Sequence, residues 1–214
     1  MKESSLSQLA TELSQCTACS LRADCIAPVG WYGNADSPLV IVGEGPGQQE
    51  DEYGCPLIGK SGQLLDKALM SVGVTRDRII TTNVVKCRPN GNRTPTLTEG
   101  NFCAGHWLEK ELEIIKPAVV VALGSVALHY LGDPKKRITK ERGIWFETRG
   151  GIPCITTYHP AYLLRQYGES LKKAKWEVYY DLKAAVDKCL ESRPDYAFSS
   201  GEMTNLFTLF PKRT

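Results

Sequence analysis

Residues 39–47 have the sequence LVIVGEGPG, in which a continuous apolar run ends at Gly43 and a glycine-rich loop follows. A short run that is apolar throughout is typical of a strand buried on both faces of a parallel sheet. We expect further strands at residues 79–85, 118–123 and 153–157. Glycine at the end of the first strand would let another molecule approach the backbone closely.

Helical patterns separate these segments. The apolar spacing predicts helices at residues 5–15, 63–72 and 170–190, and another that begins at Thr96 and stops at Pro117. Thr96 and Glu99 match a capping box at the start of that helix. Strands that alternate with helices indicate a parallel sheet covered on both faces.

We therefore expect an α/β fold, a single three-layer α/β/α domain with a central, mostly parallel four-stranded sheet. A chain of 214 residues is long enough for one sizeable core. We assign the domain to residues 1–193 and expect residues 194–214 to form a loosely held C-terminal tail.

Composition and charge narrow the functional class. The net charge of +2 excludes a strongly basic protein that coats nucleic acid without regard to sequence, but local basic clusters still allow DNA binding. Two clusters are present, and either could also be a solvated loop: Lys86, Arg88 and Arg93, and then Lys135, Lys136, Arg137, Lys140 and Arg142. We find neither a signal-peptide pattern nor a run of about 18 apolar residues, so we expect a cytoplasmic protein without a membrane span.

The eight cysteines are informative in that setting. In a reducing compartment, clustered cysteines bind metal more often than they form disulfides. Cys16 and Cys19 form a CxxC pair, with Cys87 and Cys103 far downstream. We expect the other four to be small apolar packing residues: Cys25, Cys55, Cys154 and Cys189.

Three loops after predicted strands carry polar side chains. In an open α/β sheet, ligands bind at the carboxyl ends of the strands. Glu44, Asn83 and His159 lie in such loops, so a carboxylate, an amide and an imidazole would meet at one edge. Each has an ordinary structural explanation by itself, as a helix cap, a turn residue or a core histidine. Together they indicate a functional site.

One competing motif is a P-loop pattern, GxxxxGK[ST], at residues 54–61. A P-loop needs a strand that runs directly into its first glycine, but the predicted strand ends near Gly43. Pro56 also removes one of the backbone N–H groups that would bind phosphate. Nucleotide hydrolysis therefore stays a distant alternative.

Several motifs occur in a fixed order along the chain: the CxxC pair, residues 43–51, residues 59–66, residues 82–93, Cys103 and the His159 loop. With this ordered set the chain resembles the family-4 uracil-DNA glycosylases, the iron–sulfur branch of their superfamily, from Cys16 to about Ala185. The resemblance implies a DNA-repair enzyme that hydrolyses the N-glycosidic bond of flipped-out deoxyuridine. It would be a monomer acting on single- or double-stranded DNA during base excision repair.

The resemblance also implies a cofactor. Its ligands would be Cys16, Cys19, Cys87 and Cys103, which would hold a 4Fe–4S cluster with a structural role. Zinc in the same four sulfurs is the alternative. No cofactor is expected in the chemical step.

Roles at the base follow from the substrate and from the resemblance. The Asn83 amide can donate to uracil O4 and accept from N3–H, whereas cytosine presents the reverse pattern. Glu50 would crowd the methyl group of thymine, and backbone N–H groups at Gly45 would help to fix the base. His159 would donate a hydrogen bond to O2 of the leaving uracil, and Glu44 would position water and stabilise the cationic sugar.

Two further features concern DNA binding and the fit of the base. Leu163 and Leu164 could fill the space that the flipped base vacates, and Arg165 could contact phosphate. Leu57 stands where the family usually has an aromatic residue that stacks on uracil, a contact worth roughly 1–3 kcal/mol. This change leaves open a catalytically weak DNA-binding relative, or a glycosylase for another deaminated base.

Overall fold

The computed structural model describes residues 2–213 and has one mixed sheet, with the strand order β1-β3-β2-β4-β6-β5. The strands are β1 (Tyr32–Gly33), β2 (Leu39–Gly43), β3 (Ile80–Asn83), β4 (Val119–Leu123), β5 (Trp145–Glu147) and β6 (Pro153–Thr157). The four inner strands are parallel to one another, and the two edge strands are antiparallel to their neighbours.

The α-helices are α1 (Lys2–Ser14), α2 (Gln48–Tyr53), α3 (Lys60–Ser71), α4 (Leu97–Cys103), α5 (Glu109–Ile115), α6 (Gly124–Leu131), α7 (Ile138–Glu141), α8 (Pro160–Leu163), α9 (Gly168–Ser192) and α10 (Leu206–Leu209). Short helical turns are η1 (Ser20–Asp24), η2 (Arg76–Arg78), η3 (Asn90–Asn92) and η4 (Ala104–Leu108), the last a π-helical turn that joins α4 to α5. The predicted capping box is present, since the Thr96 hydroxyl accepts from Glu99 N–H and the Glu99 carboxylate accepts from Thr96 N–H.

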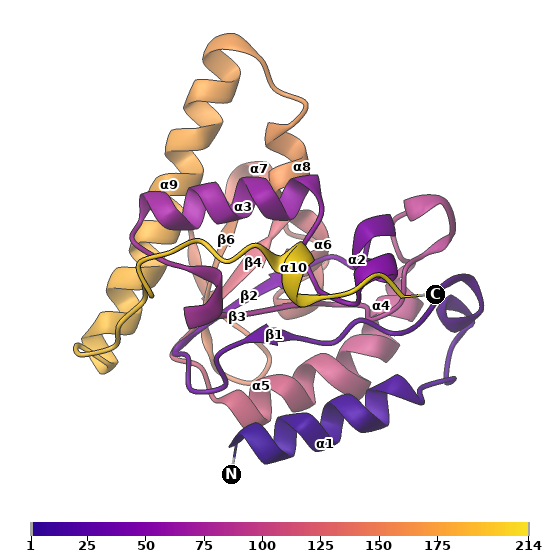
Figure 1. Ribbon diagram of the computed structural model, residues 1–214. Helices are drawn as coiled ribbons and strands as arrows, with labels where there is room; N and C mark the ends of the chain where they lie inside the picture. Colours follow the sequence, from indigo (N-terminus) through magenta and orange to yellow (C-terminus); the bar gives the residue numbers. More distant parts are fainter. Residues whose placement is uncertain (1, 214) are drawn as a thin grey trace.

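Helices cover both faces of the sheet, with α1 and α5 on one side and α3 and α9 on the other (Figure 1). Alternate strand residues divide between the two layers: Val40 and Val120 pack towards α1 and α5, whereas Ile41 and Val121 pack towards α3 and α9. The core therefore lies in two layers, and the carboxyl ends of β2, β3, β4 and β6 meet along one edge.

The sheet has six strands, not the four expected from the sequence. The four predicted strands are the parallel inner ones, β2, β3, β4 and β6. The two additional strands are β1, with two residues, and β5, with three. Elements this short lie at the sheet edges and lack an apolar run.

The segment after residue 193 is packed against the body of the protein rather than loosely held. Phe198 and Leu206 are buried, and the segment is drawn between α3 and β1 in the view of Figure 1. Leu206 forms a small apolar cluster with Cys55 and Ile58. At its end, the backbone N–H of Arg213 donates to the carbonyl of Glu52.

No helix within residues 2–213 combines the length and the apolar character that crossing a membrane requires.

The contacts of α10 predict how the C-terminal segment responds to truncated side chains. Leu206 is 4% exposed, whereas Leu209 in the same helix is 55% exposed. Leu206→Ala should cost about 2 kcal/mol of local stability and increase the open population of the segment roughly thirty-fold, measured as faster limited chymotrypsin cleavage after Phe207. Leu209→Ala is the matched control and should leave the cleavage rate unchanged. Equal rates for the two variants would mean that the segment is not docked in solution.

Candidate active site

Two adjoining cavities lie at the carboxyl edge of the inner strands. Their volumes are about 630 and 540 Å³, and both are lined by Gly45, Ser61 and His159. Glu44 and Arg165 line the first, and Glu50 and Leu57 line the second. The loops of Glu44 and His159 therefore meet at the first cavity, and the loop after β3 reaches it through Pro89, whereas Asn83 itself lines neither cavity.

Asn83 is the last residue of β3, and its side chain is fully buried. Within residues 2–213, neither its amide nitrogen Nδ2 nor its amide oxygen Oδ1 has a hydrogen-bond partner. A buried polar group without a partner costs about 1–3 kcal/mol, so two on one side chain indicate a group kept for a ligand.

Gly43 provides the room for this amide. The register of β2 and β3 pairs Gly43 with Asn83. A Cβ atom at position 43 would lie only 2.4 Å from Asn83 Oδ1 and 3.4 Å from Leu57 Cδ2. The missing side chain therefore lets the amide and Leu57 lie beside each other at the end of β2.

His159 precedes α8, and its ring is held in one tautomer. The backbone N–H of Ala161 donates to His159 Nδ1 at 3.2 Å, which assigns the ring proton to Nε2. Burial, followed by the positive charge of Arg165, lowers the pKa of His159 to about 4. At neutral pH the ring is therefore an uncharged donor through Nε2–H.

Glu44 lines the same cavity as His159. Burial raises the pKa of Glu44, and a hydrogen bond from the side chain of Thr94 acts in the opposite direction. Thr94 is a site residue that the sequence analysis did not single out, although it directly follows one of the quoted motifs.

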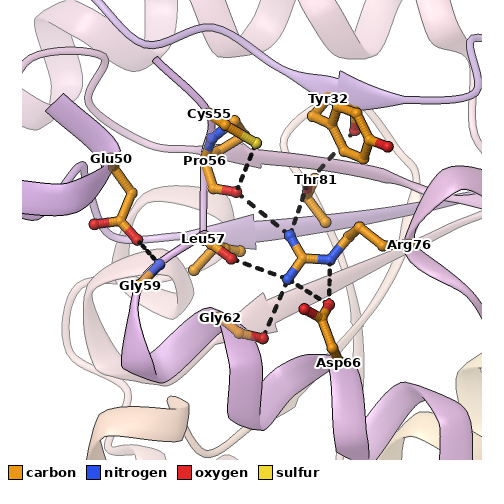
Figure 2. A network of polar contacts seen from close by, with 10 residues as sticks. All are labelled: Tyr32, Glu50, Cys55, Pro56, Leu57, Gly59, Gly62, Asp66, Arg76 and Thr81. Atoms are coloured by element: carbon orange, nitrogen blue, oxygen red, sulfur yellow. Dashed lines mark hydrogen bonds and ion pairs between the residues drawn. The ribbon is translucent and has the colours of Figure 1, made fainter. Parts of the chain in front are cut away.

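Both carboxylate oxygens of Glu50 accept backbone hydrogen bonds. Gly59 N–H donates to Oε1 at 2.8 Å, and Gly47 N–H donates to Oε2 at 3.1 Å (Figure 2 shows the Gly59 contact). Glu50 is therefore fixed in place at the wall of the second cavity. Gly45 also lines the second cavity. It has no space for a side chain, because a Cβ atom there would lie 2.6 Å from Val85 Cγ2.

The three residues predicted to contact DNA differ in exposure. Leu163 is 4% exposed and packs in the core with α9, whereas Leu164 is 48% exposed. Arg165 lines the larger cavity. Leu164 and Arg165 are thus the two that can reach another molecule.

Cysteines from three distant segments share one apolar cluster. Cys87 and Cys103 are buried in it, and Cys16 and Cys19 pack against it. The backbone N–H of Lys86 donates to Cys103 Sγ at 3.3 Å, a contact that suits a thiolate ligand. Among residues 2–213, no three His, Cys, Asp or Glu side chains are arranged to coordinate a metal ion. The thiols, the apolar surroundings and the N–H donor nevertheless fit an iron–sulfur cluster in their chemistry.

The first predicted basic cluster is not a cluster on the surface. Lys86 is fully buried, and its ammonium group donates to Glu111 at 2.7 Å and to Thr82 at 2.6 Å. Arg93 forms an ion pair with Glu99. In the second cluster, Arg142 pairs with Asp181 and Lys136 with Glu141.

Comparison with known proteins gives a consistent result. Residues 31–183 match the family model described as the uracil DNA glycosylase superfamily. A type-4 uracil-DNA glycosylase of Thermotoga maritima is 42% identical over 87% of this chain and 97% of its own length. The type-4 uracil-DNA glycosylase of Archaeoglobus fulgidus is 35% identical over 89% of this chain and 96% of its own. A type-5 enzyme of Pyrobaculum aerophilum is 32% identical over 63% of this chain and 66% of its own.

The unpaired amide predicts a gain in stability when it is removed. Asn83→Leu replaces two buried polar groups by apolar atoms of similar shape, so the free energy of unfolding should rise by about 1–3 kcal/mol, measured by urea denaturation. Asn101→Leu, on the exposed side of α4, is the control and should change stability by less than about 0.5 kcal/mol. A loss of stability in Asn83→Leu would mean that the amide has hydrogen-bond partners in the free protein.

Proposed function

The chain belongs to the type-4 uracil-DNA glycosylases of the uracil-DNA glycosylase superfamily, and we propose that it releases uracil with Asn83, His159 and Glu44 as its principal groups. It is a hydrolase of N-glycosyl bonds that acts in base excision repair. The observation that carries the assignment of residues is the buried, unpaired amide of Asn83 at the end of β3. We also propose residues 1–193 as the glycosylase domain.

The unpaired amide explains the choice of base. Uracil offers an acceptor at O4 and a donor at N3, which satisfy Nδ2–H and Oδ1 of Asn83 respectively. Cytosine offers a donor and an acceptor in the reverse order, so an Asn83 amide held in the orientation that fits uracil would be left unpaired by cytosine. In the free protein, the unpaired Asn83 amide already costs free energy, and binding uracil recovers it.

Glu50 excludes thymine. Its two backbone contacts fix the carboxylate at the cavity wall, so the side chain cannot easily move away from a methyl group on C5 of the base. Backbone N–H groups of the Gly45 loop complete the binding of the base. The base itself must leave the helical stack before it can enter this cavity.

His159 stabilises the leaving group. When the glycosidic bond breaks, negative charge develops on uracil near O2, and the neutral Nε2–H group can donate a hydrogen bond there. The contact from Ala161 N–H to Nδ1 keeps the proton on Nε2 in advance of the reaction. An uncharged ring also avoids a desolvated cation in the empty cavity.

Glu44 acts on the sugar side. As a carboxylate it would accept a hydrogen bond from the attacking water and stabilise the positive charge that develops on the sugar. Burial raises the pKa of Glu44, which makes it a better proton acceptor near neutral pH than an exposed carboxylate would be.

Leu164 and Arg165 are the groups proposed to contact DNA. Leu164 is exposed directly after α8 and can enter the space left by the flipped base, and Arg165 can pair with a phosphate. Leu163 supports them from the core.

We propose that this chain carries the 4Fe–4S cluster that its resemblance to the family-4 enzymes implies. In this chain its ligands would be Cys16, Cys19, Cys87 and Cys103. When bound, the cluster would join the segment after α1 to the segment after β3 and take no part in the chemical step. It would be structural and lie close to the DNA-binding edge.

One observation favours an altered choice of base as a second possibility. Leu57, and not an aromatic side chain, lines the cavity that Glu50 also lines. Loss of stacking would weaken binding by roughly 1–3 kcal/mol, and a narrower side chain leaves space for a larger damaged base.

Excision of uracil tests the assignment directly. Labelled oligonucleotides with a single uracil opposite G, opposite A or unpaired should yield alkali-labile sites in EDTA, and His159→Ala should lower kcat by about 10²–10³-fold. His106→Ala, an exposed histidine on η4, is the control and should retain full activity. Intact strands with folded wild-type protein would exclude uracil as the substrate. Equal activity in the two variants would remove His159 from the mechanism.

The cluster ligands make a separate prediction. Cys16→Ser should lose most of the bound iron and the visible absorbance of the cluster, measured on protein purified without oxygen. Cys25→Ser is a matched control, because Cys25 contacts Cys87 but is not among the proposed ligands, and it should keep its iron. Zinc in place of iron in the wild-type protein would indicate a tetrahedral zinc site, and loss of iron in Cys25→Ser would make Cys25 a ligand.

A further inference from the structure

Arg76 is a buried arginine that the mechanism above does not use. It lies in η2, directly before β3, and its side chain is 1% exposed. Its charge is neutralised by Asp66 of α3, whose Oδ1 accepts from Nε at 2.9 Å and lies 2.8 Å from Nη2. Figure 2 shows this pair at the centre of a network of polar contacts.

The other donors of Arg76 go mainly to the backbone of one irregular segment. Nη1 donates to the carbonyl of Pro56 at 3.3 Å, and Nη2 donates to the carbonyls of Leu57 at 3.0 Å and Gly62 at 3.3 Å. Nη1 also donates to the hydroxyl of Thr81 at 3.4 Å. The guanidinium group has five N–H donors, and these four contacts together with the Nε contact to Asp66 engage all of them.

The segment that Arg76 holds has an unfavourable backbone. Leu57 has φ of +54°, a left-handed conformation that costs a residue with a side chain about 1–2 kcal/mol. Gly62 fits tightly against it, since a Cβ there would lie 1.6 Å from the Leu57 carbonyl oxygen. Such a conformation persists only where its surroundings fix it, and the inward carbonyls of residues 56 and 57 are fixed by Arg76.

The same segment forms the wall of the base cavity. It places Leu57 against Gly43, next to the Asn83 amide, and two residues later Gly59 N–H holds Glu50. A shift of this segment would therefore move both the apolar contact to the base and the carboxylate that excludes a substituent on C5.

We propose that Arg76, paired with Asp66, is a positioning residue that sets the dimensions of the base cavity through the backbone of residues 56–62, and so determines the discrimination between uracil and 5-substituted uracils. The inference rests on the proposed function. Arg76 lines neither of the two cavities, and it acts through Leu57 and Glu50.

Lysine cannot replace arginine in this role. A lysine keeps the charge opposite Asp66, but its ammonium group is a single point with three donors and cannot reach several carbonyls in a planar arrangement. Arg76→Lys thus separates the charge, which is retained, from the geometry, which is lost.

The test compares Arg76→Lys with Arg78→Lys on two substrates, uracil and 5-bromouracil, whose bromine is close to a methyl group in size. In Arg76→Lys, KM for uracil should rise about tenfold with a smaller change in kcat, and the ratio of kcat/KM for 5-bromouracil to that for uracil should rise about tenfold. Arg78→Lys is the matched control, because Arg78 lies in the same turn and pairs at the surface with Asp77, and both values should stay unchanged.

A second variant tests whether Arg76 acts through the backbone of Leu57. Glycine adopts a positive φ without strain, so Leu57→Gly removes the need for a restraint at that residue. Added to Leu57→Gly, the Arg76→Lys change should raise KM by less than about threefold, well below its effect in the wild-type background. Hydrogen exchange of the Gly59 amide should also be faster in Arg76→Lys than in Arg78→Lys.

The outcomes distinguish failure of the positioning role from failure of the proposed function. If wild type and Arg78→Lys release uracil but Arg76→Lys leaves the substrate ratio and the Gly59 exchange unchanged, the positioning role is wrong and the proposed function stands. Full additivity with Leu57→Gly would also overturn it. If the wild-type protein releases no uracil, the proposed function fails, and this inference fails with it.

Discussion

The parallel register of β2 and β3, which places Gly43 beside Asn83, is the constraint on which the site depends. Side chains alternate along a strand, so a slip of one residue would turn the amide to the other face of the sheet. The backbone hydrogen bonds continue beyond the strands, from Val84 N–H to the Gly43 carbonyl and from Val85 N–H to the Glu44 carbonyl. The sheet therefore holds Asn83 and the loop that carries Glu44 in fixed positions relative to each other.

Exclusion of water changes the acid–base properties of the side chains at the carboxyl edge of the sheet. Burial disfavours charge on any group, so it lowers the pKa of His159 and raises that of Glu44. The imidazole becomes a neutral donor, and the carboxylate becomes more basic. At Asn83, which has no charge to lose, the same environment leaves hydrogen-bonding capacity unused. Burial thus affects all three groups that we propose to act on the base.

The parts of this arrangement that were predictable are those with a periodic or chemical signal. The four inner strands, the Thr96 cap and the shared cavity of Glu44 and His159 follow from apolar runs and from loops at strand ends. The strands β1 and β5 have only two and three residues, so they show no apolar pattern that would predict a strand. The burial of Arg76 and Lys86 could not be predicted from the sequence, because a basic residue is normally solvated. Only the tertiary structure supplies their buried partners.

The docked C-terminal segment has a consequence for how the enzyme is made. Cys55 and Ile58, on either side of the pocket residue Leu57, pack against Leu206, which the ribosome adds much later. A nascent chain that already contains all the proposed catalytic residues still exposes this apolar patch until residues near 206 emerge. Premature termination before Leu206 would therefore yield a chain that has all the proposed catalytic residues but leaves Cys55 and Ile58, beside Leu57, without this apolar partner.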